Sequence, residues 1–314
     1  MRKLRIGHLS TLYHTAFILK GNGWIEGKMG IETEWKLFPT GPEMVKAFAK
    51  GELDIGYLGL PPVMIAIDRG IALKCIAGGH MEGTVLTASE KIKSYEETGS
   101  IKETLEQLKG KTVGTPSKGS IHDVIVRAVL EEAGLQQDVS VKNFDWADLV
   151  LWALENDEVQ AAAGTPALAV LSSQFLNAKI ILSPHAMWPY NPSYGIVATK
   201  DTIESHSDLL RGFLVLHEKA CNLIREKPLT AAKLVAETVR IMDEKFIMRV
   251  YKVSPKYCAS LSPEYLQSTM AFAPVLQKLG YINRSVTEQE VFHKAIIEGV
   301  HDQPPHYDDP LMLA

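Results

Sequence analysis

The sequence Lys111-Thr-Val-Gly-Thr-Pro-Ser-Lys-Gly-Ser-Ile-His-Asp-Val-Ile-Val-Arg-Ala-Val-Leu130 joins a short apolar run to an amphipathic one through a polar turn. It predicts a buried strand over 111–114, a tight turn over 115–119 and a helix that begins near Ser120. A helix start has four N–H groups without intrahelical partners and carries about half a positive charge. Such a turn can therefore seat an anion, although an ordinary capped helix has the same sequence signature.

The composition is that of a globular protein with two cores. The chain has 314 residues, of which 46% are apolar and 22% are charged, and this length predicts two lobes. The net charge of −4 and a pI near 6.2 argue against a nucleic-acid partner. Cys75, Cys221 and Cys258 lack the spacing of a metal finger or a C-x-x-C motif, so we expect buried free thiols that do not indicate a compartment.

No apolar run reaches the roughly 18 residues of a membrane span. The opening Met1-Arg-Lys-Leu-Arg leads into a strand pattern and not into the apolar region of a secretory signal. Two expectations follow. The protein is cytoplasmic if native as given, or extracytoplasmic, in the periplasm or at the cell surface, if a signal was removed from this form.

Strands and helices alternate in the first 88 residues. The apolar pattern predicts strands over 4–9, 32–38, 53–59, 72–77 and 84–88, and helices over 16–28, 43–50 and 63–68. In doubly wound α/β sheets, ligands bind at the carboxyl ends of the strands. The loops at Ser10, Thr40, Leu60 and Gly78 are therefore expected to converge on one crevice.

The second half predicts another lobe and then a helical part. The polar stretch 89–109 is interpreted as a crossover between lobes. Further strands are predicted over 139–144, 159–163, 179–183 and 193–199, the last returning through a hinge at Tyr194-Gly195. Helices are predicted over 120–134, 148–155, 167–174, 207–226, 229–242, 244–251, 263–279 and 288–298. The tail over 301–310 contains His301, His306, Asp308 and Asp309, and we favour a solvated or surface-draped tail over a metal cluster.

Four segments carry a resemblance to a known family: Gly41–Gly56, Leu108–Gly114, Ala153–Ala162 with Pro166, and Leu261–Ile282. In this order and spacing they resemble the solute-binding proteins of ABC importers of the nitrate/sulfonate/taurine type, including the thiamine-precursor-binding relatives. The resemblance implies an α/β, two-lobe periplasmic binding protein type II fold with a ligand cleft between the lobes and a helical C-terminal part. Lobe I would be 1–88 and 198–314, and lobe II 89–197 with the crossovers.

The resemblance also implies a binding site drawn from both lobes. Ser120 and the N–H groups of Gly119 to Ile121 would hold an anionic head, while Lys118 and His122 would supply charge. The histidine follows the serine one residue earlier than in sulfonate binders of the family, which on a helix turns its side chain by about 100°. The expected ligand-binding residues are Ser10, Thr11, Tyr13, His14, Thr40, Gly41, Gly59, Leu60, His80, Lys118, Gly119, Ser120, His122, Trp146, Thr165, Tyr190 and Tyr194.

Other chemistry has weaker support in the sequence. His8, His14, His80, His122 and His185 lie in or near the cleft loops, but hydrogen bonding is favoured over a metal site, which needs three or four converging ligands. Asp148, near Trp146, leaves room for an amine or zwitterion as ligand. The chain has no G-x-S-x-G, P-loop, G-x-G-x-x-G after a strand, or H-E-x-x-H motif. We therefore expect no catalytic residue, no metal and no cofactor.

The predicted function is that of a binding protein. It would capture a small polar ligand, an organic or inorganic anion, and present it to the membrane permease of an ABC importer. Such a protein is expected to be a monomer. The alternative is a cytoplasmic sensor or an enzyme of cofactor biosynthesis on the same fold.

Overall fold

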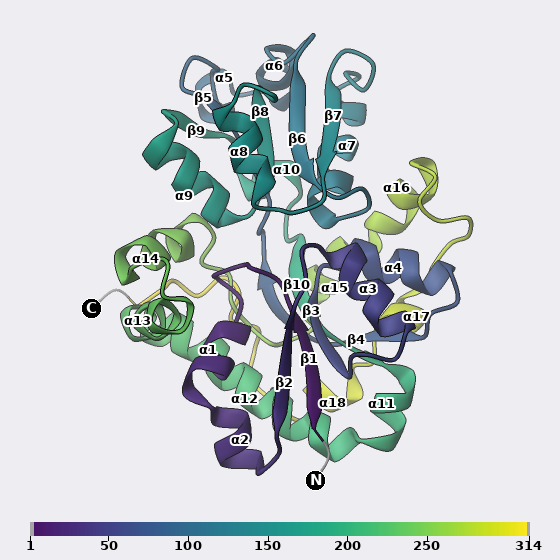
Figure 1. The fold of residues 1–314 in the computed structure, drawn as a ribbon. Helices are drawn as coiled ribbons and strands as arrows, with labels where there is room; N and C mark the ends of the chain where they lie inside the picture. Colours follow the sequence, from purple (N-terminus) through teal and green to yellow (C-terminus); the bar gives the residue numbers. More distant parts are fainter. Residues whose placement is uncertain (1–2, 313–314) are drawn as a thin grey trace.

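The structure is a computed structural model that describes residues 3–312. It contains two five-stranded mixed sheets, each in its own lobe (Figure 1). The sheet of lobe I has the order β2-β1-β3-β10-β4, formed by β1 (Leu4–His8), β2 (Thr33–Leu37), β3 (Ile55–Leu58), β4 (Leu73–Met81) and β10 (Pro192–Thr199). The sheet of lobe II has the order β7-β6-β8-β5-β9, formed by β5 (Val85–Ser89), β6 (Thr112–Pro116), β7 (Ser140–Phe144), β8 (Ala161–Gly164) and β9 (Ala178–Leu182). The predicted α/β, two-lobe fold is confirmed.

Each sheet contains one strand that runs against its neighbours. β10 pairs antiparallel with β3 and β4, and β5 pairs antiparallel with β8 and β9. Both strands directly follow a passage of the chain from one lobe to the other. The predicted boundaries after 88 and 197 are therefore wrong by a few residues, because β5 already belongs to lobe II and β10 already belongs to lobe I.

Two short crossovers join the lobes side by side. The Glu82 N–H donates to the Asn191 carbonyl at 2.8 Å, and the Tyr190 N–H donates to the Glu82 carboxylate at 2.9 Å. Glu82 and Tyr190 have φ values of 60° and 57°, a left-handed conformation that costs free energy in residues other than glycine. This pair, and not Tyr194-Gly195 within β10, marks the passage between the lobes.

Helices surround both sheets. Lobe I carries α1 (Ala16–Asn22), α2 (Trp24–Met29), α3 (Gly41–Ala49) and α4 (Leu60–Asp68), then α11 (Lys200–Ser205), α12 (Ser207–Glu226), α13 (Pro228–Val239), α14 (Glu244–Val253), α15 (Pro263–Met270), α16 (Phe272–Lys278), α17 (Glu288–Val291) and α18 (Ala295–Glu298). Lobe II carries α5 (Tyr95–Thr98), α6 (Ile101–Glu106), α7 (Ile121–Glu132), α8 (Leu149–Glu155), α9 (Pro166–Phe175) and α10 (Pro184–Met187). None of these helices in residues 3–312 has both the length and the apolar character of a membrane span.

Several predicted elements have different bounds. The helix predicted over 16–28 is two helices, because Gly23 adopts a left-handed φ of 60° between them. The helices predicted over 263–279 and 288–298 are also each divided. The stretch 89–109 is not a crossover, since it contains α5 with a capping box at Ser94 and α6 with its cap at Ser100.

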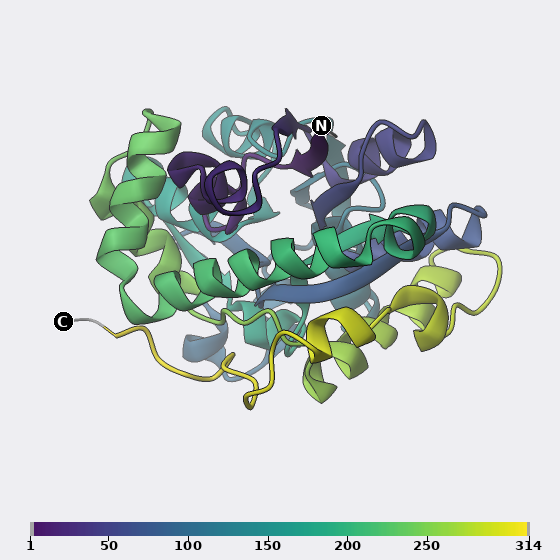
Figure 2. The ribbon, with the colours of Figure 1, turned by 90° about the horizontal axis from the view of Figure 1, so that it is seen from below.

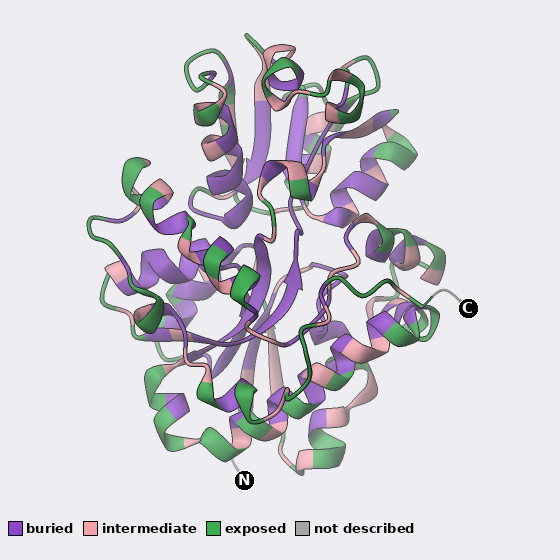
Figure 3. Ribbon diagram, turned by 180° about the vertical axis from the view of Figure 1, so that it is seen from behind, coloured by how far each residue is buried: buried purple, intermediate pink, exposed green. Residues whose placement is uncertain are grey.

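The lobes pack on each other at two places. On one side α4 and α16 contact α7, and on the other α14 contacts α9. An apolar cluster continues from Val63 and Met64 of α4 to Val124 and Ile125 of α7. Figure 3, seen from behind, shows the buried residues following both sheets and meeting where the lobes join. The structure is therefore that of two lobes in contact, with the remaining space enclosed between them.

The C-terminal tail has no helix or strand after α18, and it is draped over the surface, one of the two predicted forms. It runs along the outside of lobe I (Figure 2). Tyr307 is only 4% exposed, and its hydroxyl donates to the Ser260 carbonyl at 2.8 Å. The N–H of Met312 donates to the carbonyl of Arg225 in α12 at 2.8 Å. The tail is thus fastened to the surface of lobe I, with Tyr307 inserted into the core.

Candidate ligand-binding site

A cavity of about 40 Å³ lies between the lobes, at the carboxyl ends of strands from both sheets. Many of the residues predicted for the site line it. They are Ser10, Thr11, Tyr13, His14, Thr40, Gly41, Gly59, Ser120, His122 and Thr165. The cavity is the place where a small molecule would contact both lobes, and the binding roles of these residues remain predictions.

Four helices begin at this cavity. The residues that precede their first turns are Thr40 for α3, Gly59 for α4, Ser120 for α7 and Thr165 for α9, and all four line the cavity. The first N–H groups of a helix lack intrahelical partners, and the helix dipole places partial positive charge there. The two lobes together therefore direct the positive ends of four helices at this cavity, and this arrangement favours a negatively charged ligand.

Several polar side chains in this cavity have no hydrogen-bond partner among the described residues. They are the hydroxyls of Thr11 and Thr40 and both ring nitrogens of His14. These residues are 7%, 3% and 2% exposed. An unsatisfied buried polar group costs free energy, of the order of 1–3 kcal/mol, so such a cluster is what a polar ligand would complete.

The two cavity histidines are held in their neutral forms. Burial lowers the pKa of His122 to about 4, and burial together with nearby histidines, His80 first among them, lowers the pKa of His14 well below its ordinary value. The Nδ1 of His122 contacts the Thr84 hydroxyl at 2.9 Å. Neutral imidazoles can donate or accept hydrogen bonds, so we assign them a hydrogen-bonding role and not the charged role predicted for His122.

The turn before α7 differs in part from the prediction. The Gly119 N–H donates to the Asp123 carboxylate at 2.9 Å, and the Ser120 N–H donates to the Ser117 carbonyl at 2.9 Å. These two N–H groups are therefore not available to an anion. The N–H groups of Ile121 and His122 have no acceptor within residues 3–312. The N–H groups that remain available to an anion are therefore those of residues 121 and 122, whereas the prediction was 119–121.

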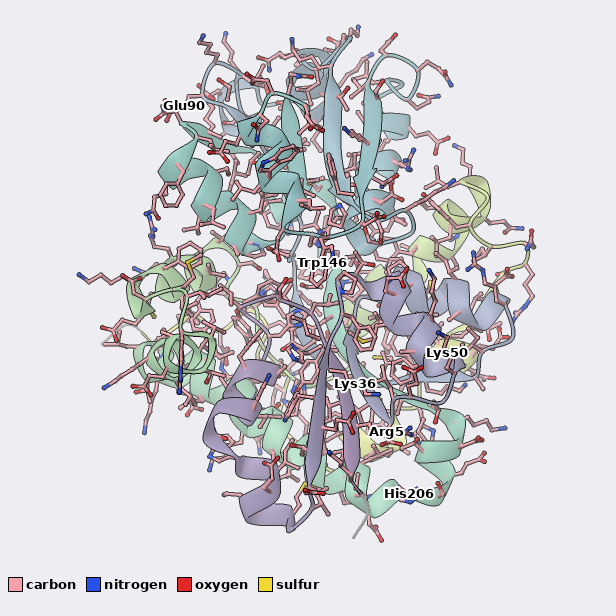
Figure 4. The ribbon with its side chains drawn as sticks, in the orientation of Figure 1. Arg5, Lys36, Lys50, Glu90, Trp146 and His206 are labelled. Carbon is pink, nitrogen blue, oxygen red and sulfur yellow. The ribbon has the colours of Figure 1, made fainter. Side chains whose placement is uncertain are left out.

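Lysine and arginine side chains of the described chain do not line this cavity. Lys118, predicted to supply charge, points away and lies 5.7 Å from the centre of the Tyr281 ring. Figure 4 shows Arg5, Lys36 and Lys50 within lobe I, away from the level at which the lobes meet. Positive potential at the cavity therefore comes from helix ends.

A second, larger space of about 250 Å³ adjoins the first and shares Ser10, Thr11, Ala147 and Thr165 with it. Its other lining residues are mostly apolar: Leu12, Leu151, Ala167, Leu168, Leu171, Ile241 and Met242. Asp148 also lines it and accepts a hydrogen bond from the Ser10 hydroxyl of lobe I at 3.2 Å. Burial raises the pKa of this carboxyl. A polar chamber with an apolar annex is thus formed between the lobes.

Two predicted residues lie behind the cavity wall. His80 is in β4, not in a loop after it, and its Nε2 contacts the Ser254 carbonyl at 2.8 Å. The Tyr194 ring centre lies 4.0 Å from that of His14, and its hydroxyl accepts from the Thr15 N–H at 3.3 Å. Both lie behind Tyr13 and His14 on the core side, and neither lines the cavity.

Other predicted residues lie elsewhere. Leu60 is fully buried in the first turn of α4, and Gly119 packs near Ile65. Trp146 is 41% exposed at the level where the lobes meet (Figure 4), while its neighbour Ala147 lines both spaces. Tyr190 is at the crossover described above. For Leu60, Gly119 and Trp146, a residue next to each in sequence lines the cavity instead: Gly59, Ser120 and Ala147.

Some lining residues were not predicted. Ser193 donates to or accepts from the Tyr13 hydroxyl at 2.7 Å, and Pro39, Pro62, Pro116 and Ile121 complete the wall. Pro39 and Pro116 end strands, a position from which the strand-end rule could have found them. Ser193 had no such signal, since it belongs to a strand and reaches the cavity only because β10 starts at the crossover.

No group of three metal-ligating side chains is found in the cleft among residues 3–312. The one such group, formed by Glu218, Cys258 and His301, lies in lobe I where the tail meets α12.

A sequence model of the NMT1-like family matches residues 1–240. The chain belongs to this family. The resemblance to solute-binding proteins of ABC importers is confirmed for this NMT1-like protein by its relatives and by its fold.

Over 305 residues the chain is 25% identical to a protein of Bacillus subtilis (strain 168) that bears the provisional name aliphatic sulfonates-binding protein. The alignment covers 95% of this chain and 88% of the Bacillus protein. The alkanesulfonate-binding protein SsuA from Xanthomonas axonopodis pv. citri, solved with MOPS, is similar in structure, with a TM-score of 0.77, 16% identity, and coverage of 92% of this chain and 98% of that chain. The nitrate-binding protein NrtA from Synechocystis PCC 6803 gives a TM-score of 0.76 at 11% identity, covering 98% and 90%.

Proposed function

We propose that this NMT1-like protein binds a small organic anion that carries an apolar part, and delivers it to the permease of an ABC importer. The observation that carries the proposal is the convergence of four helix starts and of unpartnered hydroxyls on one end of an interlobe cavity. The headgroup would accept hydrogen bonds from the N–H groups of Ile121 and His122 and from the Thr40 hydroxyl. The apolar part would occupy the annex lined by leucines.

Relatives support the transport role. The names of the Bacillus subtilis relative and of the similar structures refer to binding of sulfonates or nitrate. A ligand carrier would work outside the cytoplasm, where the permease receives its cargo, and would perform no chemistry on it. We therefore place the protein in the periplasm or at the cell surface, and cell fractionation would test this placement.

The test of ligand class is a binding titration by calorimetry and thermal shift. The probes are methanesulfonate, butanesulfonate and hexanesulfonate, with nitrate and sulfate as anions without an apolar part and butylamine as a cationic control. We expect affinity to rise along the sulfonate series by up to about 0.8 kcal/mol per buried methylene. Binding of butylamine with no response to any anion would contradict the proposal, and conversion of a bound probe to product would contradict the role of a carrier.

A second candidate ligand is a zwitterion that carries an amine at its far end. Asp148 favours it, because this carboxyl lies in the apolar annex beside Ser10 and could pair with an ammonium group. Taurine is a suitable probe with both charges. If taurine binds more tightly than ethanesulfonate, and if Asp148→Asn removes that difference only, the zwitterion is the better assignment.

A further inference from the structure

Three metal-ligating side chains meet on the side of lobe I where the C-terminal tail is packed. The Cys258 Sγ lies 3.2 Å from the His301 Nε2, and this nitrogen lies 3.7 Å from the Glu218 Oε1. All three ligand atoms lie within 4.8 Å of one another. They come from α12, from the loop between α14 and α15, and from the tail after α18. We propose that Glu218, Cys258 and His301 bind a zinc ion that fixes the tail to the body of lobe I.

The distances suit a tetrahedral ion. Zinc binds sulfur at about 2.3 Å and nitrogen or oxygen at about 2.0–2.2 Å, which places neighbouring ligand atoms about 3.4–3.6 Å apart. The measured 3.2 and 3.7 Å lie on either side of this range, so small side-chain movements suffice. A thiolate, an imidazole and a carboxylate together form a ligand set typical of zinc.

The sulfur is surrounded as a metal-bound thiolate would be. The backbone N–H groups of His306 and Ser260 both point at the Cys258 Sγ, at 3.3 and 3.4 Å. Two such donors stabilise negative charge on sulfur and are of the kind that tunes metal-bound thiolates. On binding, the zinc–sulfur bond replaces the S–H bond and the proton leaves to solvent.

The other ligands also have supporting contacts. The Glu218 Oε2 accepts from the Ala259 N–H at 3.1 Å, which leaves the other oxygen directed at His301. The His306 ring centre lies 5.2 Å from that of His301, and its Nδ1 contacts the Asp309 carboxylate at 3.1 Å. This carboxylate–histidine pair lies beside the three proposed ligands, and His306 does not belong to the group of three. A hollow of about 50 Å³ reaches His301 from outside the group.

Charge balance is consistent with a divalent cation. A thiolate and a carboxylate supply two negative charges, and the neighbouring Arg225 is paired with Asp309, with 3.7 Å between Nε and Oδ2. The site is separate from the interlobe cavity, so it can be tested independently of the proposed transport function.

The experiment uses the full chain, freed of any affinity tag, stripped with a chelator and kept reduced. Zinc is titrated against a chromogenic chelator, and cobalt is added in a parallel experiment. We expect one zinc per chain and a sulfur-to-cobalt charge-transfer band. Cys258→Ser should abolish the band and weaken zinc binding at least about tenfold. His293→Ala is the matched control, because this histidine lies at the end of α17, outside the metal group, and should change neither readout.

Two outcomes would overturn the proposal. One is wild-type protein that binds no stoichiometric zinc or shows a cobalt spectrum without a sulfur band. The other is zinc affinity that Cys258→Ser leaves unchanged. If Cys258→Ser fails to fold, Glu218→Gln, which keeps the side-chain shape, replaces it and should also weaken zinc binding at least about tenfold. Zinc should in addition slow proteolysis of the tail in the wild type, and not in the ligand variant.

Discussion

At the scale of single residues, the candidate site is defined by polar atoms that the fold leaves without partners. Thr40 and His14 are buried yet have no protein partner within the described chain. Such groups lower the stability of the empty protein and become useful only when a ligand is bound. This predicts that substitutions here separate binding from stability.

Thr40→Val tests this separation. We expect ligand affinity to fall by about tenfold, because a hydrogen bond to the ligand is lost, while the free energy of unfolding without ligand stays the same or rises. Calorimetry with the tightest-binding sulfonate and urea denaturation measure the two quantities. Thr269→Val is the control: its hydroxyl donates to the Tyr265 carbonyl at 2.7 Å, so it should lose about 1 kcal/mol of stability and no affinity. A Thr40→Val protein that is destabilised but binds normally would contradict the assignment.

The neutral state of His122 predicts a pH dependence of stability. Its pKa is about 4 in the folded protein against 6.5 ordinarily, so the unfolded chain binds more protons between these values. The stability contribution is complete above pH 6.5 and falls as pH decreases toward 4, at about 1.4 kcal/mol per pH unit and by roughly 3 kcal/mol in total.

His122→Gln should therefore flatten the decline in unfolding free energy between pH 6.5 and 4, relative to the wild type. Urea denaturation over this pH range gives the slopes. His293→Gln should keep the wild-type slope. Parallel curves for wild type and His122→Gln would show that His122 does not titrate as described. His14, His80 and His217, whose pKa values burial also lowers, are expected to account for the slope that remains.

At the scale of elements, the start of α7 is held by a single buried carboxylate. Asp123 is fully buried and accepts from the Gly119 N–H, the Arg127 guanidinium and the Asn143 amide. The hydroxyl of Tyr281, from the C-terminal part of the chain, also donates to it. The Asp123 side chain thus fixes the turn before α7, which a ligand would face, and connects this turn to lobe I.

Asp123→Ala should destabilise the protein by about 3 kcal/mol, because it leaves several buried donors without an acceptor. Denaturant unfolding measures the change. Asp138→Ala, at an exposed turn of the same lobe, should have an effect below about 0.5 kcal/mol. Equal effects of the two substitutions would indicate that the network around Asp123 contributes little.

The sequence predicts most elements and only part of the site. Alternating apolar runs identify the strands that the structure contains, and the turn before Ser120 identifies α7. The break at Gly23 and the extension of β4 through His80 depend on packing and on pairing with β10, which local patterns do not encode. Of the predicted donors, the Gly119 N–H is engaged by the Asp123 carboxylate, a contact that the spacing alone does not reveal.

At the scale of the whole molecule, closure depends on how closely the lobes approach. A Cβ atom added at Gly59 would lie 3.3 Å from the Ile121 side chain of the opposite lobe. This is tighter than ordinary contact, so a larger residue would hold the lobes apart. The two crossovers at Glu82 and Tyr190 leave such a movement possible, because only short segments join the lobes.

Gly59→Ala should therefore weaken ligand binding by about tenfold and give a larger radius of gyration than the wild type in the presence of ligand. Calorimetry and small-angle X-ray scattering measure these effects. Gly27→Ala, in α2, is the control, because a Cβ there meets nothing within 4 Å. Wild-type binding and compaction in Gly59→Ala would show that this contact does not limit closure.

The four helix starts around the cavity have a consequence for how this protein diverges. The N–H donors that these starts would direct at a headgroup belong to the main chain, and every amino acid except proline, which already occupies first-turn positions of α3, α4 and α9, supplies the same atom there. Side chains of the leucine-lined annex can therefore be exchanged during evolution without removing the recognition of charge. Paralogues of this scaffold should retain a common headgroup and differ in the remainder of the cargo they select.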